Sequence, residues 1–346
     1  MVQSPLLPRR QLLRFAALGG AVAGSGLLAG CRGSSDDPLL LSARGELPPA
    51  WVKALPKPWR LQPLDSPAAV LEAAMQGRGA PAATLLQLSD GWAAQLDPAV
   101  LQPLVASQLL AQLAPMAAPV SRLFQPEGSP ALAFPWAFGT WVLVLRNRPD
   151  LVRRGAEGWD LLLDPSLCRK LVLPSSPRVV MELATRLTLR TDPLRQLRQQ
   201  ALAFDERDGL NLLLAGDADG VVVPSHRAVP LLISDPRLQA LLPASGSPLW
   251  WNLLLRPAAA SKSLPLEWLR DGLTLPLLDR LLAGGWVPPL PREQLAPALK
   301  RWPRQLRGLL LPPPAVLARC TNLEPLTAME RQRRQDLWDR AAPESL

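Results

Sequence analysis

Short apolar runs alternate with segments of helical spacing along the chain, and this order constrains the fold more strongly than any other feature. Residues 39–41, 59–64 and 84–88 have the length and apolar character of strands. Residues 47–55 and 67–77 lie between them and carry helical spacing, and the second segment ends at a glycine. A strand-helix-strand order of this kind favours a parallel sheet with helices on both faces.

The alternation resumes in the middle of the chain, and roughly the last hundred residues are expected to be mostly helical, with proline-rich breaks. The 346 residues suit a short N-terminal segment and two lobes of roughly 150 residues each. The fold class predicted from this pattern is α/β. Further strands are expected at residues 141–145, 171–174, 220–224 and 249–255, and helices at 159–163, 178–188 and 208–215.

The first 31 residues have the organisation of an export signal that ends in a lipid attachment site. Arg9, Arg10 and Arg14 form a basic segment, and residues 15–30 are apolar or small, with no acidic side chain. That apolar run is too short and too rich in glycine for a transmembrane helix. It leads into the sequence LAGC at residues 28–31, an aliphatic residue and two small residues before a cysteine. This lipobox pattern predicts cleavage before the cysteine and a diacylglycerol on its thiol.

Residues 1–30 are therefore expected to be removed, which leaves Cys31 as the first residue of the mature protein and residues 31–37 as a polar tether. The predicted location is the periplasmic side of a bacterial membrane, with the lipid on Cys31 as anchor. Residues 8–14, PRRQLLR, resemble the twin-arginine export motif, although that motif prefers Ser or Thr at its first position and Lys at its last. Twin-arginine export and the general secretory route both stay open.

Composition argues against several classes of function. Loss of residues 1–30 removes three of the 38 basic residues and none of the 29 acidic ones, which leaves a formal charge of about +6. The arginines are scattered and the densest run, at 331–334, is typical of a solvated helix face, so no nucleic-acid partner is expected. One histidine, no tyrosine and no CxxC, HExxH or P-loop motif predict neither a metal nor a cofactor. Cys168 and Cys320 either pair in an oxidising compartment or remain free thiols.

Several short segments, taken in order, are distinctive. They are GELPP at residues 45–49, LSDGW at 88–92, FPW at 134–136, WDLLLDP at 159–165, KLVLP at 170–174 and SGSPLWWN at 245–252. Their order and spacing resemble the extracellular solute-binding proteins of ABC importers, in the spermidine/putrescine-type group. The resemblance covers most of residues 38–340.

The resemblance implies a two-lobed periplasmic-binding-protein-like α/β fold of type II. Each lobe would be a mainly parallel sheet flanked by helices, with the ligand cleft between the lobes. Proteins of this group are not enzymes: they close on a small solute by hinge motion and then dock on a membrane permease that works with ATPase subunits. Lobe 1 would comprise residues 38–138 and 250–285, lobe 2 would comprise residues 139–249 and 286–346, and the chain would cross between them near 136–139 and 248–252.

Carried over position by position, the resemblance implies a cleft that keeps part of the aromatic wall of a polyamine site and loses most of its acids. Trp250 and Trp286 keep aromatic positions, whereas Asn252, Ser175 and Ser176 stand where that group carries acidic side chains. The predicted ligand-binding residues are Arg44, Glu46, Ser89, Asp90, Trp136, Ser175, Arg178, Trp250, Asn252 and Trp286.

Two kinds of ligand stay open. Glu46 and Asp90 offer one or two negative charges to a polyamine, but an ammonium buried without a carboxylate is unfavourable by several kcal/mol, so tight spermidine binding is not expected. A neutral or anionic solute would instead use Arg44 or Arg178. Arg178 stands at an expected helix start, where anions are favoured.

Two other functions are consistent with parts of the sequence. A structural or scaffolding lipoprotein that kept the fold and lost its ligand accounts for the missing acids. An exported hydrolase rests only on Ser225 and His226, which are adjacent in the chain and therefore face each other poorly, with no third orienting group. Trp92 and Trp141 are expected to belong to the core rather than to a ligand platform.

Overall fold

The structure is a computed structural model, and it describes residues 37–76, 83–188, 191–205 and 207–343. The predicted export signal and Cys31 lie outside these residues. Within the described ranges, no helix has both the length and the apolar character needed to cross a membrane.

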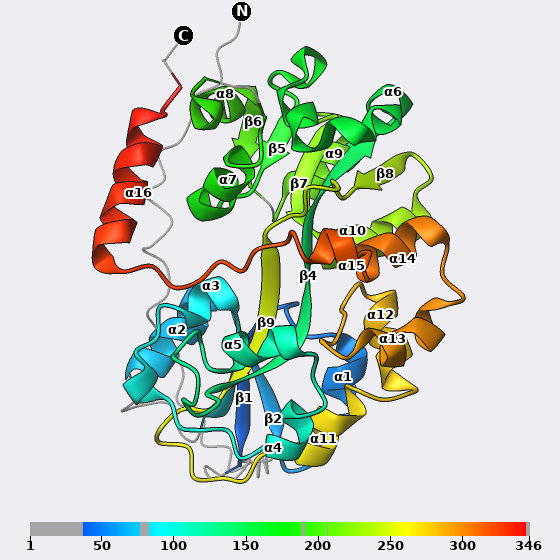
Figure 1. Cartoon of the computed structure of the whole chain (residues 1–346). Helices are drawn as coiled ribbons and strands as arrows, with labels where there is room; N and C mark the ends of the chain where they lie inside the picture. The colour runs from blue at the N-terminus through cyan, green and yellow to red at the C-terminus, as the bar shows by residue number, and fades with distance from the viewer. Residues whose placement is uncertain (1–36, 77–82, 189–190, 206, 344–346) are drawn as a thin grey trace, which may run out of the picture. The chain divides into compact units, whose positions relative to one another are not determined.

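Nine strands of the described chain form one sheet in the order β2-β1-β3-β9-β4-β7-β5-β6, with β8 paired to β4 (Figure 1). The continuous apolar runs form its centre because both faces are covered, and β9, with the sequence LWWNLLL, is buried at every position. The strands are β1 (Leu39–Ala43), β2 (Arg60–Leu64), β3 (Ala83–Ser89), β4 (Ala133–Arg146), β5 (Leu171–Leu173), β6 (Ala201–Phe204), β7 (Gly220–Pro224), β8 (Leu238–Leu241) and β9 (Leu249–Leu255).

The sheet has two parallel sets of strands, which define the two lobes. In lobe 1, β1 pairs in parallel with β2 and β3, and in lobe 2, β5 pairs in parallel with β6 and β7. Between these sets, β9 and β4 run antiparallel to their neighbours. Residues 133–140 of β4 pair with β9 and residues 141–145 pair with β7, so one strand serves both lobes. The predicted α/β class is confirmed, and the expected lobe boundary at residue 138 falls inside β4.

Helices cover both faces of the sheet. Those that pack directly on strands include α2 (Pro67–Gln76) on β1 and β3, α5 (Ala118–Ser121) on β4, and α10 (Ser225–Ser234) on β4, β7 and β8. The other α-helices are α1 (Pro49–Lys53), α3 (Asp90–Ala93), α4 (Ser107–Leu110), α6 (Pro149–Arg153), α7 (Pro177–Ala184), α8 (Pro193–Gln200), α9 (Gly209–Ala215), α11 (Leu266–Asp271), α12 (Leu277–Ala283), α13 (Arg292–Leu299), α14 (Arg304–Leu310), α15 (Pro314–Leu317) and α16 (Ala328–Arg340). Short 3₁₀ helices are η1 (Pro98–Val100), η2 (Pro115–Ala117), η3 (Gly155–Leu163) and η4 (Pro165–Leu167).

The C-terminal helix α16, red in Figure 1, lies beside α7 of lobe 2. It begins at a capping box: the Thr327 hydroxyl accepts from the Glu330 backbone N–H at 3.2 Å, and the Glu330 carboxylate accepts from the Thr327 backbone N–H at 2.8 Å. The segment before it returns to the sheet, since Pro248 forms a bridge with Thr321.

The sequence missed two strands and half of a third. β6 and β8 have four residues each, too few to show a period of their own. β4 begins at Ala133 rather than at position 141, because its first half contains Pro135, which cannot donate to a ladder, and Gly139. The pairing of β4 with β9 shifts register between Pro135 and Ala137.

A row of buried aromatic rings links α1 and α11 to the region between the lobes. Trp51 and Trp268 stack with ring centroids 4.1 Å apart, and each indole N–H donates to the other residue's backbone carbonyl, at 3.0 and 2.8 Å. Trp136 lies 5.0 Å from Trp51 and 5.1 Å from Trp286, between ring centroids. His226 then stacks on Trp286 at 4.0 Å. These contacts support His226 from behind, and His226 in turn lies between the two lobes.

Candidate functional site

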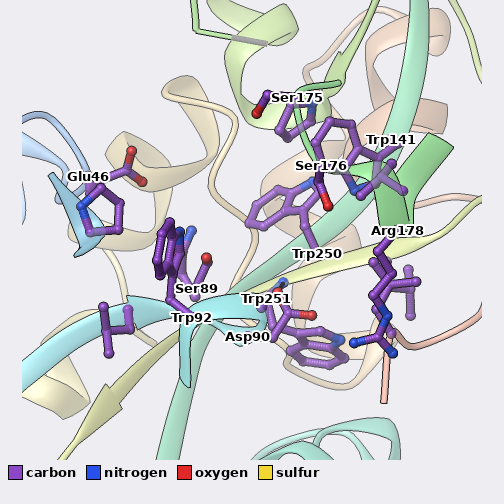
Figure 2. A pocket seen from close by; sticks show the side chains of 18 of the residues that line it. Glu46, Ser89, Asp90, Trp92, Trp141, Ser175, Ser176, Arg178, Trp250 and Trp251 are labelled. Atoms are coloured by element: carbon purple, nitrogen blue, oxygen red, sulfur yellow. Dashed lines mark hydrogen bonds between the residues drawn. The ribbon is translucent and has the colours of Figure 1, made fainter. Parts of the chain in front are cut away.

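A cavity of about 670 Å³ lies between the two lobes (Figure 2). It is lined by residues that follow the carboxyl ends of all six parallel strands, the edge at which open α/β sheets place their ligands. Its volume is that of a small-molecule site. Lobe 1 contributes Glu46 after β1, Ser66 after β2 and Asp90 after β3, and lobe 2 contributes Ser175 after β5, Arg207 after β6 and His226 after β7.

The cavity brings together most of the residues that the sequence singled out. Seven of the ten predicted ligand-binding residues line it, from four separate parts of the chain. They are Glu46, Ser89, Asp90, Ser175, Arg178, Trp250 and Asn252.

The other three predicted residues lie elsewhere. The Arg44 side chain is 67% exposed and its Nε lies 3.2 Å from the Asp65 carboxylate, outside the cavity. Trp136 occupies the bulge of β4, where the pairing shifts, and its ring is buried in the core between Trp51 and Trp286. Trp286 stands behind His226, so it supports the wall without lining it.

Asp90 is a buried acidic group of the cavity with a strongly shifted pKa. It begins α3, is 9% exposed, and accepts a hydrogen bond on Oδ1 from the Trp251 backbone N–H at 3.4 Å. Its second carboxylate oxygen, Oδ2, is buried and has no hydrogen-bond partner among the described residues. Burial raises the pKa of Asp90 to about 7, against the lowering effect of the Trp251 N–H and of the Arg178 charge. Asp90 Oδ2 could therefore accept a hydrogen bond from a further donor.

Arg178 supplies a positive charge on the same side of the cavity. It lies in the first turn of α7, and in Figure 2 its side chain extends toward Asp90. One guanidinium nitrogen donates to the Glu324 backbone carbonyl, in the segment before α16, while Nε is buried without a partner in the described structure. Burial and the Arg334 charge lower the pKa of Arg178. Asp90 and Arg178 attract each other, but the structure places no hydrogen bond between them.

Asn252 is held by a chain of side-chain hydrogen bonds. Gln87 Nε2 donates to Asn252 Oδ1 at 2.9 Å, and Ser42 Oγ donates to Gln87 Oε1 at 2.8 Å. All three residues are buried, on β9, β3 and β1. Because the Asn252 oxygen faces Gln87, the side chain offers its N–H donors rather than a charge at this position.

Tryptophans form much of the wall. Trp250 donates from Nε1 to the Thr140 carbonyl at 3.2 Å, and Trp251 donates from Nε1 to Asn322 Oδ1 at 2.9 Å. Trp92 and Trp141 also line the cavity, which the sequence did not indicate, although Trp141 is buried in the core as expected and Trp92 packs against the core while partly exposed. Trp92 follows Asp90 within one helical turn of the carboxyl end of β3, and that position was the available signal for its role.

The sequence missed Arg227, the charged partner of Glu46 in the lining. Arg227 Nη2 lies 3.7 Å from Glu46 Oε1, across 181 positions of sequence, and joins α10 of lobe 2 to the loop after β1 of lobe 1. No local pattern in the sequence marks such a pair.

His226 is a packed aromatic residue. Its ring is stacked on Trp286 and meets Trp250 edge-on at 4.4 Å, and burial lowers its pKa well below the ordinary value. Its Nδ1 has no partner among the described residues, so no carboxylate orients the ring. Ser225 is buried beside Gly139. This geometry gives the Ser225-His226 pair no feature of a nucleophile and base.

A second cavity, of about 620 Å³, lies on lobe 2 between α7, α8 and α16. Its rim carries Arg195, Arg333, Arg334 and Arg340, together with Asp192 and Glu330. Elsewhere in the described residues, Cys168 and Cys320 are free thiols, and no group of three His, Cys, Asp or Glu side chains is placed to hold a metal ion.

Comparison with solved structures identifies the fold. The chain matches the spermidine/putrescine ABC transporter substrate-binding protein PotD of Streptococcus pneumoniae with a TM-score of 0.71 and 16% sequence identity, over 88% of this chain and 98% of that one. This chain has the fold of the type II periplasmic binding proteins. The TpPotD lipoprotein of Treponema pallidum matches with a TM-score of 0.65 and 14% identity, over 88% and 98% of the two chains. No protein-family model and no curated protein matches the sequence.

A third solved structure shows how widely this periplasmic-binding-protein fold is used. Iron-bound HitA of Pseudomonas aeruginosa matches with a TM-score of 0.61 and 11% identity, over 88% of this chain and 99% of that one. The predicted two-lobed fold is thus confirmed. Because proteins named for polyamines and for iron share it, the fold alone does not identify a ligand.

Proposed function

We propose that this protein is the solute-binding component of an ABC importer, which captures a small polar solute between its lobes and delivers it to a membrane permease. The observation that carries this proposal is the cavity at the carboxyl ends of all six parallel strands, with a buried Asp90 oxygen that lacks a donor. A ligand there would meet groups from both lobes, and so would favour the closed arrangement over the open one.

The proposal includes the attachment of the protein to a membrane. Cleavage before Cys31 and lipidation of its thiol would hold the two lobes, residues 38–138 with 250–285 and residues 139–249 with 286–346, at the periplasmic face. A tethered protein stays at a high effective concentration near its permease and the associated ATPase.

The solute need not be a polyamine, although polyamine transport is the role named for several relatives. Ser175 and Asn252 place uncharged groups where the spermidine/putrescine-type group carries acids, and Glu46 is engaged by Arg227. These losses also motivate the alternative of a structural lipoprotein that has kept the fold without a ligand. The two functions differ in whether the cavity binds any solute.

A thermal-shift screen of the purified protein separates these functions. The panel contains polyamines, amino acids, sugars and organic anions, each at millimolar concentration. Transport predicts that one class raises the unfolding temperature, and that Trp250→Phe, which keeps a ring in the wall, binds the same class. A complete absence of shifts across the panel supports the structural role and contradicts the proposed function.

A further inference from the structure

The cavity is lined by one acidic and one basic residue, Asp90 and Arg178, each of which has a buried polar atom without a hydrogen-bond partner among the described residues. Asp90 Oδ2 and Arg178 Nε are both buried and have no partner within the described residues. Both residues line the same cavity. They are close enough to influence each other's charge, yet no hydrogen bond joins them. The lining therefore presents a separated pair of oppositely charged groups.

The remaining charged residues add little negative potential. Glu46 forms its ion pair with Arg227, and Arg207 adds another positive side chain to the lining. The positions at Ser175 and Asn252 are uncharged. Asp90 is thus the one acidic side chain of the lining that is not paired with an arginine in a salt bridge.

Each simple class of solute leaves part of this pattern unmatched. A diamine would place its second ammonium where Arg178 and Arg207 repel it. A dicarboxylate would face Asp90, and a neutral sugar would offer no opposite charge to the buried Asp90 or to the partly buried Arg178. A molecule with an ammonium at one end and a carboxylate at the other matches both groups at once.

We propose that the solute is a zwitterionic amino acid whose ammonium binds Asp90 and whose carboxylate binds Arg178. Its carbon chain would pack on the wall formed by Trp92, Trp141 and Trp250. An arginine suits the carboxylate end because its planar fork donates to both carboxylate oxygens. This inference rests on the proposed solute-binding function and names the substrate class of the same site.

The test is a set of titration calorimetry experiments on the purified protein with matched probes. The probes are ω-amino acids and α-amino acids of two to six carbons, together with the alkylamine, diamine, carboxylate and dicarboxylate of the same lengths. The expected result is that at least one amino acid binds tenfold or more tightly than the diamine and the dicarboxylate of its length.

Two variants test which residue binds the ammonium end of the solute and which binds its carboxylate end. Asp90→Asn should weaken the amino acid and the alkylamine by tenfold or more and leave the carboxylate unchanged. Arg178→Gln should weaken the amino acid and the carboxylate by tenfold or more and leave the alkylamine unchanged, and Arg178→Lys should lie between Gln and the native residue. The matched control is Arg333→Gln, which removes an arginine from the second cavity and should change none of these affinities.

The outcomes separate the two proposals. If a diamine or a dicarboxylate binds more tightly than every amino acid, the protein binds solutes but the zwitterion assignment is wrong. If Arg333→Gln abolishes carboxylate binding, the anion lies in the second cavity and the assignment also fails. If no probe and no member of the thermal-shift panel binds, the solute-binding function itself is contradicted.

Discussion

The Glu46 carboxylate lies 3.7 Å from the Arg227 guanidinium, and this ion pair joins the loop after β1 to α10. The two side chains belong to different lobes and are about three-quarters buried, with exposed fractions of 22% and 26%. A contact between lobes beside the cavity contributes to the free energy of the closed arrangement alone. Opening of the cleft would separate the two charges and return both to water.

Removal of this ion pair is expected to weaken solute binding modestly. A partly exposed pair contributes up to about 1 kcal/mol, so Glu46→Gln or Arg227→Gln should raise the dissociation constant of a bound solute by up to about fivefold. The double variant should bind the solute no more weakly than the single variants. The loss of affinity in each single variant should be smaller at high salt. Calorimetric titration of a solute found in the screen measures this.

Arg44→Gln is the matched control for that pair. Arg44 bonds the exposed Asp65 within lobe 1, so its loss should leave the affinity unchanged. A large loss with Arg44→Gln would instead place this residue at the solute, and additive effects of the two cleft variants would contradict a direct Glu46–Arg227 interaction.

The buried Asp90 predicts a specific dependence of stability on pH. Its pKa in the folded protein is about 7, above the ordinary value of 3.8, so between these values the folded chain holds a proton that the unfolded chain has lost. The contribution of Asp90 to the free energy of unfolding should therefore fall as pH rises from about 4 to about 7, by roughly 1.4 kcal/mol per unit of pKa shift, and stay constant above.

Asp90→Asn removes this pH-dependent contribution to the free energy of unfolding and keeps the shape of the side chain. The variant should unfold at a higher temperature than the native protein at pH 8, and the difference should vanish near pH 4. The difference between variant and native protein is the quantity to measure, because Asp150 and Asp235, with pKa values lowered from 3.8 to about 2, contribute stability that is lost as pH falls below about 4. An equal difference at both pH values would contradict the buried, proton-binding state of Asp90.

Gly139 is predicted to be indispensable at the place where β4 passes between the lobes. A methyl group there would lie 2.5 Å from Ser225 Oγ and 2.6 Å from the Trp250 ring, so Gly139→Ala should destabilise the protein by about 1–3 kcal/mol and displace the cavity wall. Urea unfolding measures the loss. The control is Gly308→Ala in α14, which meets nothing within 4 Å and should be neutral or stabilising by about 0.5–1 kcal/mol. Equal stability of the two variants would show that Ser225 and Trp250 move aside without cost.

The sequence predicted the strands better than the directions of side chains. Continuous apolar runs such as residues 171–174 and 249–255 mark buried strands whatever surrounds them, and both strands are present. Asp90 and Ser175, which the resemblance placed in one cleft, line the same cavity because each follows the carboxyl end of a parallel strand. Trp136, by contrast, turned into the core because a bulge in β4 changes which face its side chain takes, and a bulge depends on the partner strand.

The sequence predicted that the cleft has lost most of its acidic side chains. It did not predict which charged groups remain available to a solute. Asn252 is tied to Gln87, and Glu46 to Arg227, by contacts between residues far apart in the chain. Those contacts decide which charges remain for a solute, and no local pattern encodes them. The lack of a hydrogen-bond partner for Asp90 Oδ2 therefore depends on the three-dimensional arrangement of the two lobes.

Arg9 and Arg10, which precede the predicted lipobox, lead to a prediction about export. If the twin-arginine route is used, the lobes fold before they cross the membrane, and replacement of Arg9 and Arg10 by Lys should stop export and leave uncleaved protein in the cytoplasm. Cys31→Ser should act differently: it removes the thiol on which we propose the lipid, so the protein should lose its membrane association without a block at the twin-arginine step. Membrane fractionation with a mass measurement of the N-terminal peptide distinguishes the two variants. Normal export of the Lys-Lys variant would assign the protein to the general secretory route, and an unlipidated but membrane-bound Cys31→Ser protein would contradict the anchor.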